Sequence, residues 1–133
     1  ANPGTTLALT GTLAAGDVLV LCNTAFGGSG DVGLPLRTQY CDVVNTFIDH
    51  NGDDAFRLEK GATVLDQFGT FGSDPGTGWT IGTTANATVD RTLVRLPTVT
   101  AGTTDWTAGA QQWTILAVDT FTNLGSHSMT CQP

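Results

Sequence analysis

The sequence predicts an all-β fold, arranged as a β-sandwich, on the evidence of its composition and of the spacing of its turns. Of the 133 residues, 17 are glycine and only 13% are charged, roughly half of the usual share. Threonine, which favours strands, is abundant, whereas Lys, Glu and Arg, which favour surface helices, are scarce. Short runs of β-forming residues recur about every ten residues between glycine turns, as in sandwiches. The length predicts a single domain over residues 1–133.

The clearest element is a hairpin within Phe47–Gly82. Ala55–Leu58 and Thr63–Phe68 are expected to be its strands, on either side of Lys60-Gly61. Asn51-Gly52 precedes the hairpin and is a strong turn signal, because both residue types tolerate positive φ. The sequence therefore places its best-defined pair of strands near the middle of the chain.

Further strands are expected on both sides of this hairpin. The alternation of apolar and polar residues over 6–13 predicts a half-buried strand, and the continuous apolar run 18–21 predicts a central strand covered on both faces. Residues 37–44 are ambiguous and are compatible with a short helical turn. Residues 91–96 and 113–116 have the composition of strands, and Pro97 ends the first of them.

The net charge of −7 restricts the classes of partner. The five basic residues, namely Arg37, Arg57, Lys60, Arg91 and Arg95, stand against twelve acidic ones. Five scattered cations neutralise few phosphates, so direct nucleic-acid binding is not expected. The same balance disfavours docking on an anionic membrane, and no apolar run approaches the length of a membrane-spanning helix. An acidic chain of this kind suits a secreted protein that must stay soluble, or one that meets divalent cations.

The chain contains three cysteines, Cys22, Cys41 and Cys131. Cys22 and Cys41 each lie beside an expected strand or turn, where a disulfide would stabilise the fold by roughly 3 kcal/mol. The alternative is two buried thiols in a reducing compartment. With the disulfide, Cys131 is left for another chain or for a segment beyond residues 1–133.

An acidic cluster suggests a calcium site. Its candidate ligands are Asp49, Asn51, Asp53 and Asp54, which offer the oxygen atoms that calcium prefers. The spacing fails the EF-hand pattern, because glycine occupies the fourth position and Lys60 the twelfth. A loop with side-chain-stabilised turns and solvated carboxylates is the competing interpretation, so no cofactor is expected beyond this weak calcium candidate.

No catalytic site emerges from the histidines. His50 and His127 are the only two, and the neighbours of His127 in Ser126-His127-Ser128 do not face it in a strand, so they form no nucleophile relay. Two histidines without further ligands do not make a zinc site. The sequence therefore predicts a protein that is not an enzyme.

Two further patterns have alternative interpretations. Asn86-Ala87-Thr88 fits an N-glycosylation acceptor. Seven aromatic residues could form a platform for a carbohydrate or peptide, although in small sandwiches aromatic residues more often form the core; they are Phe56, Phe68, Phe71, Trp79, Trp106, Trp113 and Phe121.

The chain resembles the bacterial branch of the lamin-tail domain family. The resembling segments follow one another in order over nearly the whole sequence: Gly16–Leu21, Asn51–Leu58 with Asp66, Phe71–Trp79, Thr92–Arg95, Asp105-Trp106, Gln112-Trp113 and Asp119–His127. The resemblance implies an immunoglobulin-like β-sandwich without catalytic residues. It also implies an extracellular or cell-surface location, because bacterial domains of this family are accessory modules of secreted or surface proteins, including extracellular nucleases.

One departure from the family pattern directs attention to strand edges. The family normally has a strand-rich segment before the Gly16-Asp17-Val18 element, and here the chain opens almost at that element. A sandwich lacking a strand exposes an unpaired edge, which invites pairing with another chain. The sequence thus favours a module for protein–protein interaction or structure that assembles by strand addition, with another chain or with itself. The alternatives are a targeting module of a larger secreted hydrolase, such as a nuclease, and a glycan-binding module.

Overall fold

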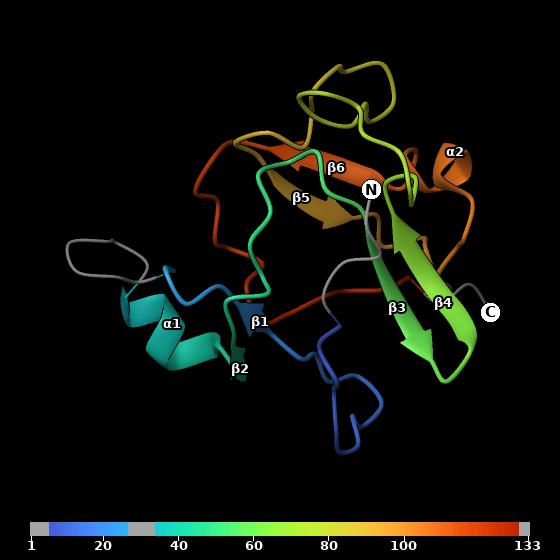
Figure 1. Cartoon of the computed structure of the whole chain (residues 1–133). Coiled ribbons are helices and arrows are strands. Elements are labelled where there is room, and N and C mark those ends of the chain that lie inside the picture. The colour runs from blue at the N-terminus through green and yellow to red at the C-terminus, as the bar shows by residue number, and fades with distance from the viewer. Residues whose placement is uncertain (1–5, 27–33, 131–133) are drawn as a thin grey trace. The chain divides into compact units, whose positions relative to one another are not determined.

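The structure, a computed structural model, describes residues 6–26 and 34–130. Within these ranges the chain is β-rich, with short strands that pair two by two and two short helices (Figure 1). It divides into two compact units. The larger unit comprises residues 50–121 and 128–130, and the smaller unit comprises residues 6–26, 34–49 and 122–127.

The larger unit contains the hairpin that the sequence predicts. β3 (Phe56–Lys60) and β4 (Thr63–Phe68) pair in antiparallel fashion and form the two green arrows of Figure 1. Gly61, at the turn, has φ of +60°, a conformation that glycine adopts without steric cost. The register shifts after Leu58, which pairs with Asp66, because the next pair is Glu59 with Val64. Leu65 is therefore an extra residue on β4, as in a β-bulge.

A second hairpin-like pair completes the strands of the larger unit. β5 (Thr92–Arg95) and β6 (Trp113–Leu116) are antiparallel, with Arg95 opposite Trp113. Between them lies the short helix α2 (Trp106–Gly109), whose first turn is capped because the Asp105 side chain accepts a hydrogen bond from the Thr107 backbone N–H. Both strand predictions in this region are confirmed.

The buried core of the larger unit is small, and half-buried aromatic rings pack around it. Trp79 is 7% exposed, and Ile81, Ala87 and Ala110 are also buried. Around them the rings of Phe68 and Trp106 lie 4.8 Å apart, Phe68 and Trp113 lie 5.5 Å apart, and Trp79 and Trp106 lie 6.0 Å apart, measured between ring centres. Four of the seven aromatic residues of the sequence pattern therefore pack against one another, as the core interpretation of that pattern expects.

Two glycines allow close packing in this unit. A Cβ at Gly69 would lie 2.7 Å from the Trp79 ring, and Gly69 also has φ of +74°. A Cβ at Gly102 would overlap the Leu65 carbonyl oxygen and would lie 2.7 Å from the Asp66 Cβ. The absence of a side chain at these positions lets Trp79 pack on β4 and lets the segment 102–103 lie directly beside it.

The smaller unit is built around a parallel pair of very short strands and one helix. β1 (Leu21–Cys22) pairs with β2 (Val43–Val44), and α1 (Leu34–Tyr40) precedes β2. Pro35 lies in the first turn of α1, where its missing N–H is not needed. Arg37 of α1 donates hydrogen bonds from its Nη1 to the carbonyl oxygens of Thr24 and Phe26.

The disulfide prediction is confirmed. Cys22, at the end of β1, is bonded to Cys41, directly after α1, and their Cα atoms lie 5.8 Å apart. Cys22 is 6% exposed. The bridge therefore fixes the helix to the parallel strand pair at a buried position.

The strand predictions for the N-terminal region are wrong. Residues 6–20 contain no strand, and of the predicted apolar run 18–21 only Leu21 belongs to one. Leu9, Leu13 and Leu19 are 42%, 56% and 42% exposed. The physical reason is that alternation alone does not make a strand, because a strand needs a partner for its backbone groups, and pairing in the described residues begins only at Leu21. The ambiguous segment 37–44 contains the end of α1 and all of β2.

Candidate interaction edge

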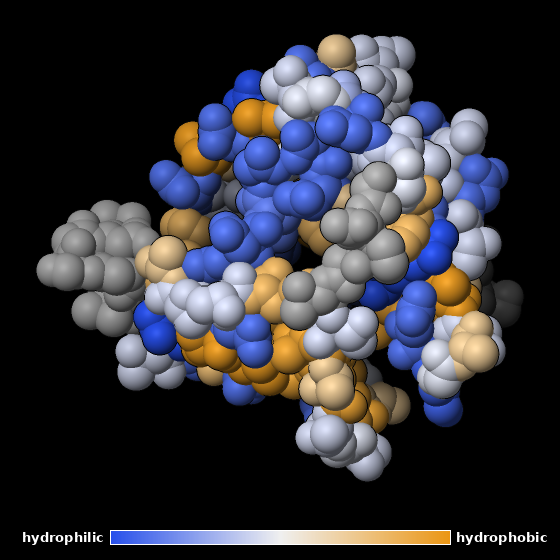
Figure 2. Space-filling view, viewed as in Figure 1, coloured by the Kyte–Doolittle hydropathy of each residue, from blue (hydrophilic) through white to orange (hydrophobic). Residues whose placement is uncertain are grey.

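β3 is the most exposed regular element of the larger unit. All five of its side chains are exposed, including the apolar Phe56 and Leu58, at 39% and 50%. Over the hairpin, apolar and hydrophilic surface alternate on the face shown in Figure 2. A strand with this exposure contributes little to the core, so its composition is free to serve contacts with other molecules.

The two faces of β3 are held differently. Phe56 stacks on Phe68 of β4, with ring centres 5.1 Å apart, and the centre of the His50 ring lies 5.0 Å from that of Phe56. On the opposite face the Arg57 Nε donates a hydrogen bond of 2.8 Å to the Gln67 Oε1. The Arg57 guanidinium carbon also lies 3.9 Å from the centre of the Phe71 ring. Side-chain contacts with β4 and with Phe71 therefore hold β3 in place.

The hydrogen-bond pattern shows which backbone groups of β3 face away from β4. The Gln67 backbone N–H donates to the Thr103 carbonyl oxygen at 2.9 Å, so the backbone N–H and C=O groups of Gln67 point away from β3. Gln67 pairs with Arg57, and in an antiparallel pair of this kind both residues direct their N–H and C=O groups outward. The direction of the backbone groups alternates from one residue to the next along a strand. The backbone N–H and C=O groups of Glu59, two residues after Arg57, therefore also point outward. Among the described residues, no backbone hydrogen bond reaches Arg57 or Glu59 from outside the hairpin.

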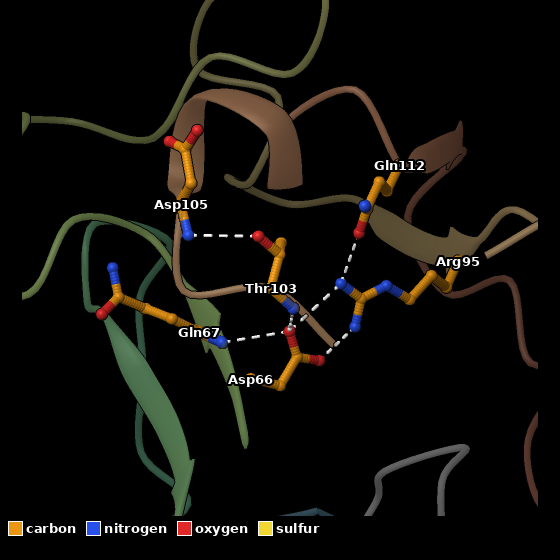
Figure 3. A network of polar contacts seen from close by, with 6 residues as sticks. All are labelled: Asp66, Gln67, Arg95, Thr103, Asp105 and Gln112. Atoms are coloured by element: carbon orange, nitrogen blue, oxygen red, sulfur yellow. Dashed lines mark hydrogen bonds and ion pairs between the residues drawn. The ribbon is translucent and has the colours of Figure 1, made fainter. Parts of the chain in front are cut away.

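Behind the hairpin, a polar network centred on Asp66 holds β4 in place (Figure 3). The Asp66 carboxylate forms an ion pair with the Arg95 guanidinium of β5. Its Oδ1 also accepts hydrogen bonds from the backbone N–H groups of Thr103, at 2.9 Å, and Gln67, at 3.0 Å. Arg95 in turn donates to the Gln112 Oε1 at 2.5 Å. The network thus connects β4, β5 and the segment before α2.

The same contacts set the ionisation of Asp66. Burial raises the pKa of this carboxyl group, but the hydrogen bonds and charge of Arg95 and the backbone N–H groups of Thr103 and Gln67 outweigh burial, and the pKa lies below the ordinary value of 3.8. Since the pKa is lower in the folded chain than in the unfolded chain, ionised Asp66 stabilises the fold above pH 3.8. This contribution is lost as the pH falls below 3.8 and through the folded pKa.

We expect the Asp66→Asn variant to lose about 2 kcal/mol of unfolding free energy at pH 7, because Arg95 keeps its position without a charged acceptor. The difference from the original chain should shrink as the pH falls below 3.8. Urea unfolding followed by circular dichroism at several pH values measures both effects. Asp105→Asn is the matched control, since asparagine caps a helix as well as aspartate does. A pH-independent difference would show that the charge of Asp66 plays no part.

Two backbone carbonyl groups of the acidic segment before the hairpin accept hydrogen bonds from other parts of the larger unit. The Gly52 carbonyl oxygen accepts a bond of 2.5 Å from the Thr88 hydroxyl, and the Asp54 carbonyl oxygen accepts one of 3.0 Å from the Trp79 Nε1. The side chains of Asp49, Asn51 and Asp54 are exposed. Over residues 6–26 and 34–130, no group of three or more His, Cys, Asp or Glu side chains is placed to hold a metal ion. These hydrogen bonds attach the backbone of the segment to Trp79 and Thr88.

The two histidines lie in different units. His50 packs on Phe56 in the larger unit. His127 lines an open hollow of the smaller unit, together with Leu13, Gly16, Asp17, Val18, Leu19, Asp42, Gly125 and Ser126. The Ser126 hydroxyl donates to the Asn123 carbonyl oxygen, at 3.5 Å. His50 thus lies against an aromatic ring, and His127 lies in the lining of an open hollow that includes two aspartates.

The remaining predicted site residues are Asn86 and Cys131. Asn86 is exposed and has φ of +52°, in a turn whose Thr88 hydroxyl also accepts a bond from the Trp79 N–H at 2.8 Å. Cys131 lies outside the described residues. No helix in the part of the chain that the structure describes is long and apolar enough to cross a membrane.

Sequence reasoning missed the two residues that define the open edge, Arg57 and Glu59. The predicted strand ended at Leu58, before Glu59, and the signal that marks the two residues is their opposite charge at positions two residues apart. It also missed the pairing of Asp66 with Arg95, which lie 29 residues apart.

Comparison of the chain with protein-family models, with curated proteins and with solved structures finds no match.

Proposed function

We propose that this chain is a non-catalytic extracellular module that binds another polypeptide by adding a strand to the open edge of β3. The observation that carries the proposal is the outward direction of the Arg57 and Glu59 backbone groups on a fully exposed strand. Strand addition uses such groups for affinity and uses alternate side chains for specificity.

The position of β3 within the unit supports this role. β4 is bonded to β3 on one side and receives Thr103 on the other, so β4 is a supported strand and β3 is its outer neighbour. The Asp66 network fixes β4 to β5. A partner strand would therefore add to a sheet that is already held in place, which lowers the conformational entropy that binding must overcome.

The proposed fold is an immunoglobulin-like sandwich of the lamin-tail type. It is supported by the gathering of segments that carry the resemblance: Asp66, Arg95 and Gln112 come from three of them and meet in one hydrogen-bonded network. Asp105 caps α2 at the edge of the same network. In the proposal, the strand added to β3 extends the β3–β4 sheet of this sandwich.

The proposed extracellular location is supported by the buried Cys22–Cys41 bridge. Disulfides persist in oxidising compartments and are rare where thiols are kept reduced. The net charge of −7 favours solubility at the protein concentrations of such an environment.

Amide hydrogen exchange in dilute solution tests whether the edge of β3 is open. We expect the amides of Arg57 and Glu59 to exchange rapidly, because they point away from β4, and those of Phe56, Leu58 and Lys60 to be protected. Two-dimensional NMR on the full chain measures each amide separately. The amides of β5 and β6 that lie within their ladder serve as the internal control.

The two outcomes are clearly separated. An alternating pattern along β3 supports an edge that is available to a partner. Strong protection of all five amides in a monomer would show that the edge is covered within the chain, and the proposed mode of binding would be wrong.

A further inference from the structure

We infer that the strand added to β3 is the β3 of a second copy of this chain, antiparallel and centred on Leu58. This inference rests on the proposed function and specifies its partner. The resulting dimer has two-fold symmetry, with Arg57 of each copy opposite Glu59 of the other. Both residues are exposed, and no ion pair in the described residues uses either side chain.

The backbone of β3 fits this register. Arg57 and Glu59 are the residues whose N–H and C=O groups point outward. When two copies are centred on Leu58, each outward residue lies opposite an outward residue of the other copy. Such a pair exchanges two hydrogen bonds, so the two symmetric pairs would form four. The Leu58 residues then lie opposite each other in the intervening non-hydrogen-bonded pair, where side chains approach closely.

The side chains also fit this register. Residues directly opposite on neighbouring strands project from the same face, and opposite charges there are stabilising. Arg57 and Glu59 lie symmetrically about Leu58, so each of these two residues meets the opposite charge when the strand pairs with its own reversed copy. The Arg57–Gln67 hydrogen bond and the Phe71 ring already restrain the arginine. On the other face, the exposed apolar surface of Phe56 and Leu58 is covered by Lys60 and Leu58 of the second copy.

Neighbouring registers are disfavoured by the same residues. A shift by one residue would place outward groups opposite inward ones, which breaks the hydrogen bonds. A shift by two residues would place Arg57 opposite Arg57 or Glu59 opposite Glu59, and like charges directly opposite each other are destabilising. The charge order of β3 therefore selects one antiparallel register.

Sedimentation of the full chain over a wide concentration range, combined with charge reversal, tests the inference. The original chain should show a concentration-dependent monomer–dimer equilibrium. Arg57→Glu places four glutamates at the seam and Glu59→Arg places four arginines there, so each variant alone should dimerise about tenfold more weakly, or not at all. An equal mixture of the two variants should recover dimerisation, because every pair across the seam is again of opposite charge.

Two further variants separate charge effects from folding effects. Arg91→Glu makes the same change in net charge at an exposed position outside β3 and should dimerise like the original chain. The double variant with Arg57→Glu and Glu59→Arg should also dimerise, since the swap preserves complementarity. If the mixture and the double variant both stay monomeric while the original chain dimerises, the proposed register is overturned.

A monomer at all concentrations would overturn the choice of a second copy as the partner. The proposed function would still stand if the Arg57 and Glu59 amides exchange rapidly in that monomer, because the edge would be open to a different polypeptide. If these amides are protected in the monomer, the proposed function fails as well. The two experiments thus distinguish a wrong partner from a closed edge.

Discussion

Replacing Trp79 with alanine is expected to lower the free energy of unfolding by about 3–5 kcal/mol, the usual cost of removing a large core aromatic residue. Trp79 is 7% exposed, and its ring fills the space above Gly69 and lies edge-on to Trp106. Its Nε1 also fixes the Asp54 carbonyl oxygen. The substitution removes ring packing and a hydrogen bond together, so the larger unit should lose much of its stability. Urea unfolding followed by far-ultraviolet circular dichroism measures the loss.

Trp79→Phe is the matched control, because it keeps much of the ring packing and removes the Nε1 donor. We expect it to cost clearly less than the alanine variant, by an amount that includes about 1–3 kcal/mol for the Asp54 carbonyl left without its donor. If Trp79→Ala unfolds at the same urea concentration as the original chain, the residue is not part of the core, and the aromatic platform interpretation regains support.

Removing the disulfide is expected to be the second large effect. Cys22 and Cys41 are 19 residues apart, and cross-linking a loop of this length stabilises by roughly 3 kcal/mol. Among its described residues, the smaller unit has otherwise a pair of two-residue strands and a seven-residue helix. The Cys22→Ala and Cys41→Ala double variant should therefore lose protection of the Val43 and Asn45 amides, which bond to the carbonyl oxygens of Val20 and Cys22.

Hydrogen exchange of the double variant, beside the oxidised original chain, measures this prediction. Chemical reduction of the original chain should give the same change as the double substitution, which separates loss of the bridge from loss of the sulfur atoms. Unchanged protection at Val43 and Asn45 after reduction would mean that hydrogen bonding and packing hold the smaller unit without the bridge.

The central hairpin was predictable from the sequence because its signals are local. β-forming residues lie on both sides of Lys60-Gly61, and a glycine at the turn accepts a positive φ. The strand prediction began at Ala55, one residue early, and ended at Leu58, two residues short of the end of β3 at Lys60. The charged residues Glu59 and Lys60 weaken the β signal, but pairing with Val64 and Thr63 of β4 extends the strand through them.

The disulfide was also predicted from local signals, because Cys22 and Cys41 each lie beside an expected strand or turn. The strand predicted over residues 6–13 is absent from the structure, because the alternation of apolar and polar residues says nothing about the presence of a partner strand. The exposure of Leu9 and Leu13 shows that apolar residues in a regular pattern remain outside when no partner backbone lies beside them.

The Asp66 network could not be derived from the sequence pattern, because it depends on distant segments. Arg95 reaches Asp66 only because β5 and β4 are brought together, and the Thr103 N–H reaches it only because Gly102 leaves room for the backbone. The open edge of β3 likewise depends on how distant segments come together in the fold. The register of β3 on β4 sets the direction of the Arg57 backbone groups, and the Gln67–Thr103 hydrogen bond on the far side of β4 shows that this direction is outward.

The most direct test of strand addition at β3 is a measurement of contacts between chains by NMR. Equal amounts of isotope-labelled and unlabelled chain are mixed at a concentration where dimers are present, and nuclear Overhauser effects between the two kinds of chain are recorded. We predict contacts between the Leu58 Hα of one copy and that of the other, and between the Arg57 amide and residues near Glu59. A dimer whose contacts between chains involve other surfaces, with none at β3, would contradict strand addition at β3.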